Sequence, residues 1–115
     1  MDAVADTLAL LRQASVVAAN IEAALAGTAL TVDRWRALVF IATEPGCSMS
    51  DLVEALMVPS TSVTRIVDSL VEIGAVFRTV SPNDRRRTTL RLSSHGQALL
   101  RDVEPAIVAI NATHL

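Results

Sequence analysis

The 115-residue chain has no lysine and no tyrosine, and it contains a single cysteine, Cys47. One cysteine cannot form an internal disulfide, which fits a reducing cytoplasm. The two histidines, His95 and His114, have no acid or thiol at the spacing of metal ligands. No glycine-rich loop is present to hold a phosphate group. The sequence therefore predicts no metal site, no cofactor and no enzymatic activity.

Long apolar runs are also missing. The longest unbroken run, residues 37–42, is too short to span a membrane. The N-terminus carries Asp2 and Asp6 in place of the basic residues of a signal peptide. An aromatic surface for stacking single-stranded bases or RNA is not expected, because the three aromatic residues fall at apolar positions: Trp35, Phe40 and Phe77. We expect a cytoplasmic protein with no membrane partner.

Charge is unevenly distributed along the chain. Hydrophobic residues make up 51% and charged residues 19%, so a folded core is feasible. Residues 1–59 carry three arginines and seven acidic residues, a balance of −4 within a net charge of −2. Residues 60–93 carry six arginines and three acidic residues, a balance of +3, and residues 94–115 add −1. Local positive charge attracts a polyanion, so the segment 60–93 is the candidate nucleic-acid surface.

Helical periodicity is present at both ends of the chain. Residues 2–26 place apolar side chains at three- and four-residue steps, with Gly27 as the expected C-cap. The last helix is expected to begin after a capping Ser93 or Ser94, and Pro105 is expected to kink or break it. The two apolar stripes can be core or subunit interface. We favour an interface that includes Leu8, Leu11, Ile21, Leu99, Val103, Ile107 and Ile110.

Two short helices are predicted ahead of the positive segment. The first runs from a capping Thr31 to Thr43. Its expected buried face consists of Trp35, Leu38, Val39 and Ala42. A capping box formed by Ser48 and Asp51 then begins the second, which contains Leu52, Val53 and Leu56. Residues 58–60 are the expected turn after it.

A further helix, predicted over residues 61–73, completes a helix-turn-helix. It buries Val63, Ile66, Val67 and Leu70. Two short helices joined by a three-residue turn have this role when the second lies in a major groove. The residues expected to meet the duplex are Ser60, Thr61, Ser62, Thr64 and Arg65. Hydroxyl groups at a helix start are equally explained by ordinary capping on a solvated face, and the sequence leaves that alternative open.

A β-hairpin wing is predicted next. The segments 75–81 and 88–92 show strand patterning, and Pro82, Asn83 and Asp84 form a turn between them. The loop that follows carries Arg85, Arg86 and Arg87. Such a loop can enter a minor groove, whose negative potential attracts arginine, although a solvated charged turn is the alternative. The order of elements predicts a mainly α fold with a small β-hairpin wing, a winged helix-turn-helix.

The free thiol of Cys47 lies just before the capping box. A cysteine there could sense oxidants if its pKa were lowered, but no cationic residue flanks it in the sequence. We expect it to pack as a small hydrophobic residue.

These residues carry a resemblance to the MarR family of winged-helix transcription factors from bacteria and archaea, over about residues 31–100. It is based on Trp35, the run 62–70 and the wing run 82–86, together with Leu30, Thr31, Gly74, Arg78, Leu90, Leu92, Ser93 and Gly96. The resemblance implies a homodimer that binds double-stranded DNA, most often as a repressor. It also implies that Asp84 orients Arg86 into the minor groove, and that a small, often phenolic or aromatic effector relieves binding, although no pocket residue can be named.

Three departures from the family pattern affect what is expected. Ser81 stands where relatives often have Asp, and Ser93 where they usually have Thr. Relatives usually continue past the position of Leu115 with a longer fifth helix and a sixth. We expect a reduced or rearranged dimer, with residues 1–29 and 94–115 as dimerisation helices and residues 30–93 as the DNA-binding domain. Function is expected to be sequence-specific binding of a palindromic operator. The alternative is a winged-helix module that docks a protein without promoter-specific DNA binding.

Overall fold

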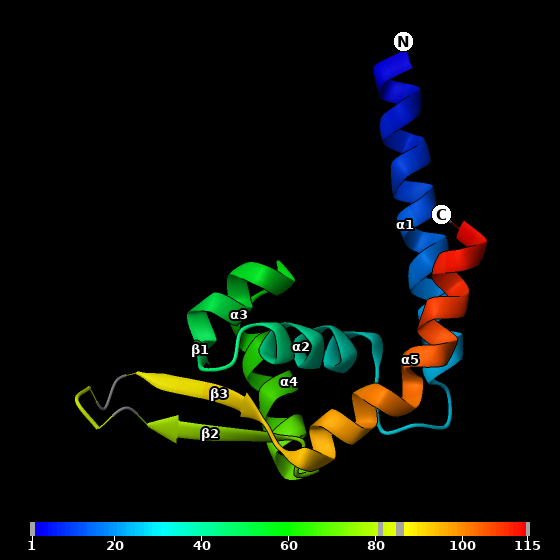
Figure 1. Cartoon of the computed structure of the whole chain (residues 1–115). Coiled ribbons are helices and arrows are strands. Elements are labelled where there is room, and N and C mark those ends of the chain that lie inside the picture. Colours follow the sequence, from blue (N-terminus) through cyan, green and yellow to red (C-terminus); the bar gives the residue numbers. More distant parts are fainter. Residues whose placement is uncertain (1, 81, 85–86, 115) are drawn as a thin grey trace. The chain divides into compact units, whose positions relative to one another are not determined.

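The computed structural model describes residues 2–80, 82–84 and 87–114, with side chains described through residue 110. Within that part, the chain forms five helices and one three-stranded antiparallel sheet (Figure 1). The elements are α1 (Asp2–Leu25), α2 (Val32–Thr43), β1 (Cys47–Ser48), α3 (Met49–Leu56), α4 (Ser60–Glu72), β2 (Val76–Val80), β3 (Thr88–Leu92) and α5 (Ser94–His114). The predicted mainly α fold with a small wing is confirmed.

The chain divides into two compact units. One comprises residues 1–32 and 103–115, and the other comprises residues 33–102. In the first unit Leu25, Leu30 and Val103 are buried. Most of α1 is exposed, including the large apolar side chains of Val4, Leu8, Leu10, Leu11 and Val16.

Helix α1 is also long and apolar enough, by length and composition alone, to cross a membrane. A search for unbroken apolar runs does not detect this, because polar residues interrupt the apolar ones along the helix. An apolar helix with so little burial within its own chain needs another surface to cover it.

Helix α5 continues through Pro105 without a break, so of the two expected effects of this proline, a kink or a break, the break does not occur. A proline removes one N–H donor, whose partner in a helix would be the carbonyl four residues earlier, at Arg101. Arg101 is exposed. At an exposed position water can replace a missing backbone bond, which limits the cost of the proline.

The core of the second unit consists of apolar faces of α2, α3 and α4 together with strand β3. Its largest fully buried side chains are Leu38, Ile41, Leu52, Val63, Val67, Leu70 and Leu90. The predicted buried face of α4 is confirmed at Val63, Val67 and Leu70, while Ile66 is half-buried.

The predicted buried face of α2 is confirmed at Leu38, while Trp35 is half-buried and the positions of Val39 and Ala42 are wrong. Ala37, Leu38 and Ile41 are buried, whereas Val39 and Ala42 are exposed. The run 37–42 is apolar throughout, so its periodicity does not distinguish one face from the next. Burial of Arg34 in part, on the same side as Ala37 and Ile41, obscures the pattern further.

The sheet has a strand that the sequence did not predict. β1 is two residues long and pairs with β3, so that the strand order is β1-β3-β2. Its Cys47 lies opposite Leu90, and on the other side of β3 the hairpin pairs Val76 with Leu92 and Val80 with Thr88. The wing is thus attached to the start of α3 as well as to α4. β2 is an edge strand on which Phe77 is 60% exposed, so this aromatic side chain does not belong to the core.

The junction between β3 and α5 depends on a close backbone approach. Ser93 caps α5: its hydroxyl accepts a bond from the Gly96 N–H at 3.0 Å and donates to the Gly74 carbonyl at 2.5 Å. The Ser93 N–H donates to the Ala75 carbonyl at 2.9 Å. A Cβ atom on Gly96 would overlap that same carbonyl oxygen, so only glycine fits there.

Replacement of Gly96 is expected to destabilise the second unit. In Gly96→Ala the added methyl group must displace the Ala75 backbone, which should lower the free energy of unfolding by about 1–3 kcal/mol. Urea denaturation followed by circular dichroism measures this. The exposed neighbouring change Gln97→Ala is the control and should leave the midpoint nearly unchanged. Equal midpoints for both variants would contradict the close-approach explanation.

Candidate nucleic-acid interface

The turn between α3 and α4 has three residues, Met57, Val58 and Pro59, one residue earlier than predicted. The capping box at the start of α3 is confirmed: the Ser48 hydroxyl accepts from the Asp51 N–H at 3.1 Å, and the Asp51 carboxylate accepts from the Ser48 N–H at 3.0 Å. Met57 ends α3 in the left-handed region, with φ 57° and ψ 38°. The backbone passes from this turn directly into the first turn of α4.

The start of α4 is not capped by a hydroxyl group. Pro59 occupies the N-cap position and makes no side-chain bond. Its carbonyl accepts from the N–H groups of Ser62 and Val63, at 3.0 and 3.1 Å. The Thr64 hydroxyl donates to the Ser60 carbonyl at 3.0 Å, within the helix. Ordinary capping therefore does not account for the serine and threonine residues in this turn.

The polar face of α4 is open to solvent. Ser60, Thr61, Thr64 and Arg65 are exposed, and Ser62 is half-buried. The opposite face is held in the core by Val63, Val67 and Leu70. Helix N-terminal N–H groups and hydroxyl donors favour phosphate oxygens, and an arginine can contact phosphate or a base edge.

Two arginines of α2, which the sequence did not single out, tie it to the helix-turn-helix. Arg34 donates through Nε to the Ser69 hydroxyl at 3.0 Å, and that hydroxyl donates to the Ile66 carbonyl at 2.6 Å. Arg36 donates to the Leu56 carbonyl, at the end of α3, at 2.7 Å. A cation is favourable at a helix C-terminus because the helix dipole is negative there. Side chains of α2 therefore hydrogen-bond to both helices of the motif, α3 and α4.

The wing is joined to α4 by an ion pair between Arg78, on β2, and Asp68. Asp68 lies on the exposed side of α4, one turn beyond Thr64. This pair spans the two parts of the motif that are expected to reach DNA. The only sequence signal for it is that Arg78 and Asp68 both lie in the segments that carry the family resemblance.

At the wing tip, Arg85 and Arg86 lie outside the described residues, so the expected contact of Asp84 with Arg86 lies outside them too. Asp84 and Arg87 are exposed, and the Arg87 N–H donates to the Asp84 carbonyl at 3.0 Å. A notch of about 330 Å³ separates this part of the wing from the start of α3. The pKa of Asp51 is lowered, mainly by its bonds to Ser48 and also by the positive charge of Arg87.

Cys47 is buried, as expected. Burial raises the pKa of its thiol, and the negative charges of Asp51 and Glu44 raise it further. The neutral thiol is therefore the favoured form at neutral pH, which argues against an activated thiolate.

The chain is similar in sequence and in fold to known transcriptional regulators. The sequence model of the MarR family matches residues 30–87, about half of the chain, and the chain belongs to this family. Its members are transcriptional regulators and not enzymes. A regulatory protein from Thauera aromatica, described as putative and for the hcr operon, is 38% identical over 71 residues. That match covers 62% of this chain and 43% of the relative, so the chain spans less than half of that relative's length.

Two solved structures are similar over most of the chain. The MarR family protein Rv2887 of Mycobacterium tuberculosis, in complex with salicylic acid, is 27% identical with a TM-score of 0.77, and the match covers 92% of this chain and 78% of that one. The transcriptional repressor CouR, bound to a 23-mer DNA duplex, is 26% identical with a TM-score of 0.79 and coverage of 87% and 70%.

The bond from Arg34 is expected to stabilise α4. Ser69→Ala removes the acceptor for the Arg34 guanidinium, and the free energy of unfolding should fall by about 0.5–1.5 kcal/mol. Ser62→Ala, a half-buried serine on the same helix, is the matched control and should be neutral or slightly stabilising, because alanine favours helix. Chemical denaturation of both variants measures the difference. A Ser69→Ala variant as stable as Ser62→Ala would show that the bond contributes nothing.

Proposed function

We propose that this protein is a transcriptional regulator that binds a specific double-stranded DNA sequence as a homodimer. The observation that carries the proposal is the exposed polar face of α4, held from behind by Val63, Val67 and Leu70. A helix with this division of faces can enter a major groove while its apolar side stays in the core.

Thr64 and Arg65 are the proposed centre of the contact. Both are exposed, and they follow Ser60, Thr61 and Ser62, which would meet the phosphate backbone at the start of the helix. Arginine contacts guanine through two hydrogen bonds, so Arg65 is the side chain best suited to reading a base. The Asp68–Arg78 ion pair keeps the wing at a defined position beside this helix.

The wing is the proposed second contact. Arg85, Arg86 and Arg87 would approach the minor groove, with Asp84 holding Arg86 in one orientation. The exposure of Arg87 and Asp84 supports this assignment. Two contacts on one subunit fix the register and the orientation of the protein on the duplex.

The relatives support repression and a small ligand. Relatives from Mycobacterium are named transcriptional repressors, CouR is bound to DNA, and Rv2887 is bound to salicylic acid. We propose repression of a palindromic operator, relieved by a small aromatic effector.

Salt dependence tests the DNA contacts. Once a bound duplex has been selected from a random pool, Arg65→Ala and Arg86→Ala should each weaken binding by about 1–3 kcal/mol and reduce the salt slope by roughly one unit. Arg101→Ala, on α5, is the charge-matched control and should leave the slope unchanged. Fluorescence anisotropy at several salt concentrations measures both quantities. Failure of the wild-type chain to bind any duplex would favour the alternative, a winged-helix module that docks a protein.

The apolar surface of α1 is the proposed dimer interface, continued by α5. Leu8 and Leu11 are exposed, the latter at 61%, and Ile21 is half-buried. On α5, Leu99, Ile107 and Ile110 are half-buried, whereas Val103 is packed within the chain. A second copy of the chain would cover these side chains, and the two recognition helices would then be related by a two-fold axis.

Leu11→Glu places a charge in this surface and should disrupt association, because a carboxylate buried in an apolar interface is strongly unfavourable. Gln13→Glu adds the same charge at an exposed polar position of α1 and is the control. Sedimentation equilibrium should show a dimer for the wild type and the control, and a monomer for Leu11→Glu. A wild-type monomer at tens of micromolar, or α1-dependent binding to lipid vesicles, would contradict the dimer proposal.

A further inference from the structure

The chain passes between its two compact units at two points. The first crossing lies between residues 32 and 33, at the start of α2, and the second lies between residues 102 and 103, inside α5. The segment before the first crossing, residues 26–31, is neither helix nor strand. Such a segment bends more easily than a helix. The stiffness of α5 at residues 102–103 therefore decides how freely one unit can turn relative to the other.

Pro105 weakens α5 at this second crossing. In an α-helix each N–H donates to the carbonyl four residues earlier, so the N–H groups of residues 103–106 span the crossing. Proline has no N–H, so the bond from residue 105 to the Arg101 carbonyl is missing, whereas the neighbouring residues keep their donors. The helix thus lacks one backbone bond at the point where it leaves one unit and enters the other.

The position of this proline is unusual within the chain. The described residues include all four prolines, and Pro105 alone lies inside a helix, since the other three lie in turns, in a bend or at a helix end: Pro45, Pro59 and Pro82. Sharp bends in helices occur almost always at prolines or at a few other specific features. The crossing between the units therefore coincides with the point where α5 is easiest to bend.

Packing around the same point gives a second, independent observation. Val103 is only 5% exposed and is the single buried residue of this part of α5. The side chains around it are exposed to solvent: Arg101, Asp102, Glu104, Pro105 and Ala106. A bend centred on Val103 would leave that side chain in place and would move only side chains that already contact water. Little buried apolar area would be lost, so little free energy opposes the bend.

We propose that residues 101–105 of α5 are a hinge on which the second unit turns relative to the first. The missing backbone bond lowers the stiffness of the helix, and the exposed side chains offer no packing that would restore it. A hinge of a few residues absorbs the change in backbone angles, so each unit moves as a rigid body and keeps its own core.

The hinge has a consequence for DNA binding, and this step rests on the proposed function. In the proposed dimer α1 joins the subunits, and each α4 reads one half-site. One base pair added between the half-sites moves them apart by about 3.4 Å and rotates one relative to the other by about 35°. Units that turn on a hinge can follow such a change. The dimer should therefore accept operators with more than one spacing.

Residual dipolar couplings of the backbone N–H groups test the hinge in the full-length chain without DNA. The couplings of residues 2–32 and 103–110 are fitted as one set, and those of residues 33–102 as another. Units that turn independently give two different alignment tensors, whereas a rigid molecule gives one. The wild type should give two, and Pro105→Ala should bring them together, because alanine restores the missing bond and favours helix.

Glu104→Ala is the matched control, since it changes an exposed neighbour and leaves the bond from residue 105 missing. It should give two tensors, as the wild type does. One common tensor for the wild type, or an unchanged difference between the tensors in Pro105→Ala, would overturn the proposal.

Operators of altered spacing test the consequence for DNA binding. The selected operator is compared with versions that have one base pair added or removed between the half-sites. The wild type should lose about threefold in affinity and Pro105→Ala about tenfold or more, because a stiffer helix populates fewer of the required orientations. Equal losses would overturn the role of the hinge in DNA binding. Failure of the wild type to bind any duplex would instead contradict the proposed function, and the dipolar couplings would still decide whether the hinge exists.

Discussion

Burial of one face of α4 is the constraint on which the rest of the motif depends. Val63, Val67 and Leu70 are fully enclosed, so the helix cannot rotate about its axis without exposing them to water. Because the buried positions recur every three or four residues, the exposed positions are determined by the same rotation. The orientation of Thr64 and Arg65 toward solvent is therefore a consequence of packing on the opposite side.

Polar side-chain bonds then fix the relative orientation of the helices and the wing, which apolar packing alone leaves adjustable. Arg34 and Arg36 reach from α2 to α4 and to the end of α3, and Arg78 reaches from the wing to Asp68. Such directional bonds discriminate between nearby packings of similar apolar area.

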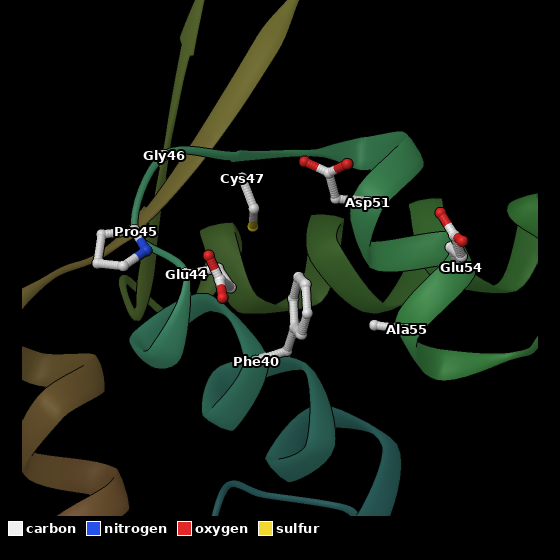
Figure 2. Close-up of a pocket in the computed structure, with 8 residues that line it drawn as sticks. All are labelled: Phe40, Glu44, Pro45, Gly46, Cys47, Asp51, Glu54 and Ala55. Atoms are coloured by element: carbon white, nitrogen blue, oxygen red, sulfur yellow. The ribbon is translucent and has the colours of Figure 1, made fainter.

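Charge is also segregated within this unit. Glu44, Asp51 and Glu54 belong to the segment before α4 (Figure 2), and the arginines of the wing follow it, so an acidic chain still concentrates positive charge in one segment.

Sequence patterns predicted the elements in which apolar and polar residues alternate clearly or in which a local capping motif is present. The amphipathic α4, the capping box at Ser48 and the bounds of β3 were all predictable, since each follows from local chemistry. The buried face of α2 was not, because the run 37–42 is apolar all round. Strand β1 is too short to show a period, and it exists only because β3 lies beside it. The bonds made by Arg34, Arg36 and Arg78 join residues on different elements, which no single-segment pattern reveals.

The proline at the N-cap of α4 has a consequence for motion. Among the described residues no side chain caps the first N–H groups of α4, and helix ends without such a cap open readily. The amides at the start of α4 should therefore exchange with solvent much faster than those near Leu70. A phosphate oxygen in that place would act as the absent cap and slow this exchange. Recognition would then include a local ordering step, in which the duplex completes the helix that reads it.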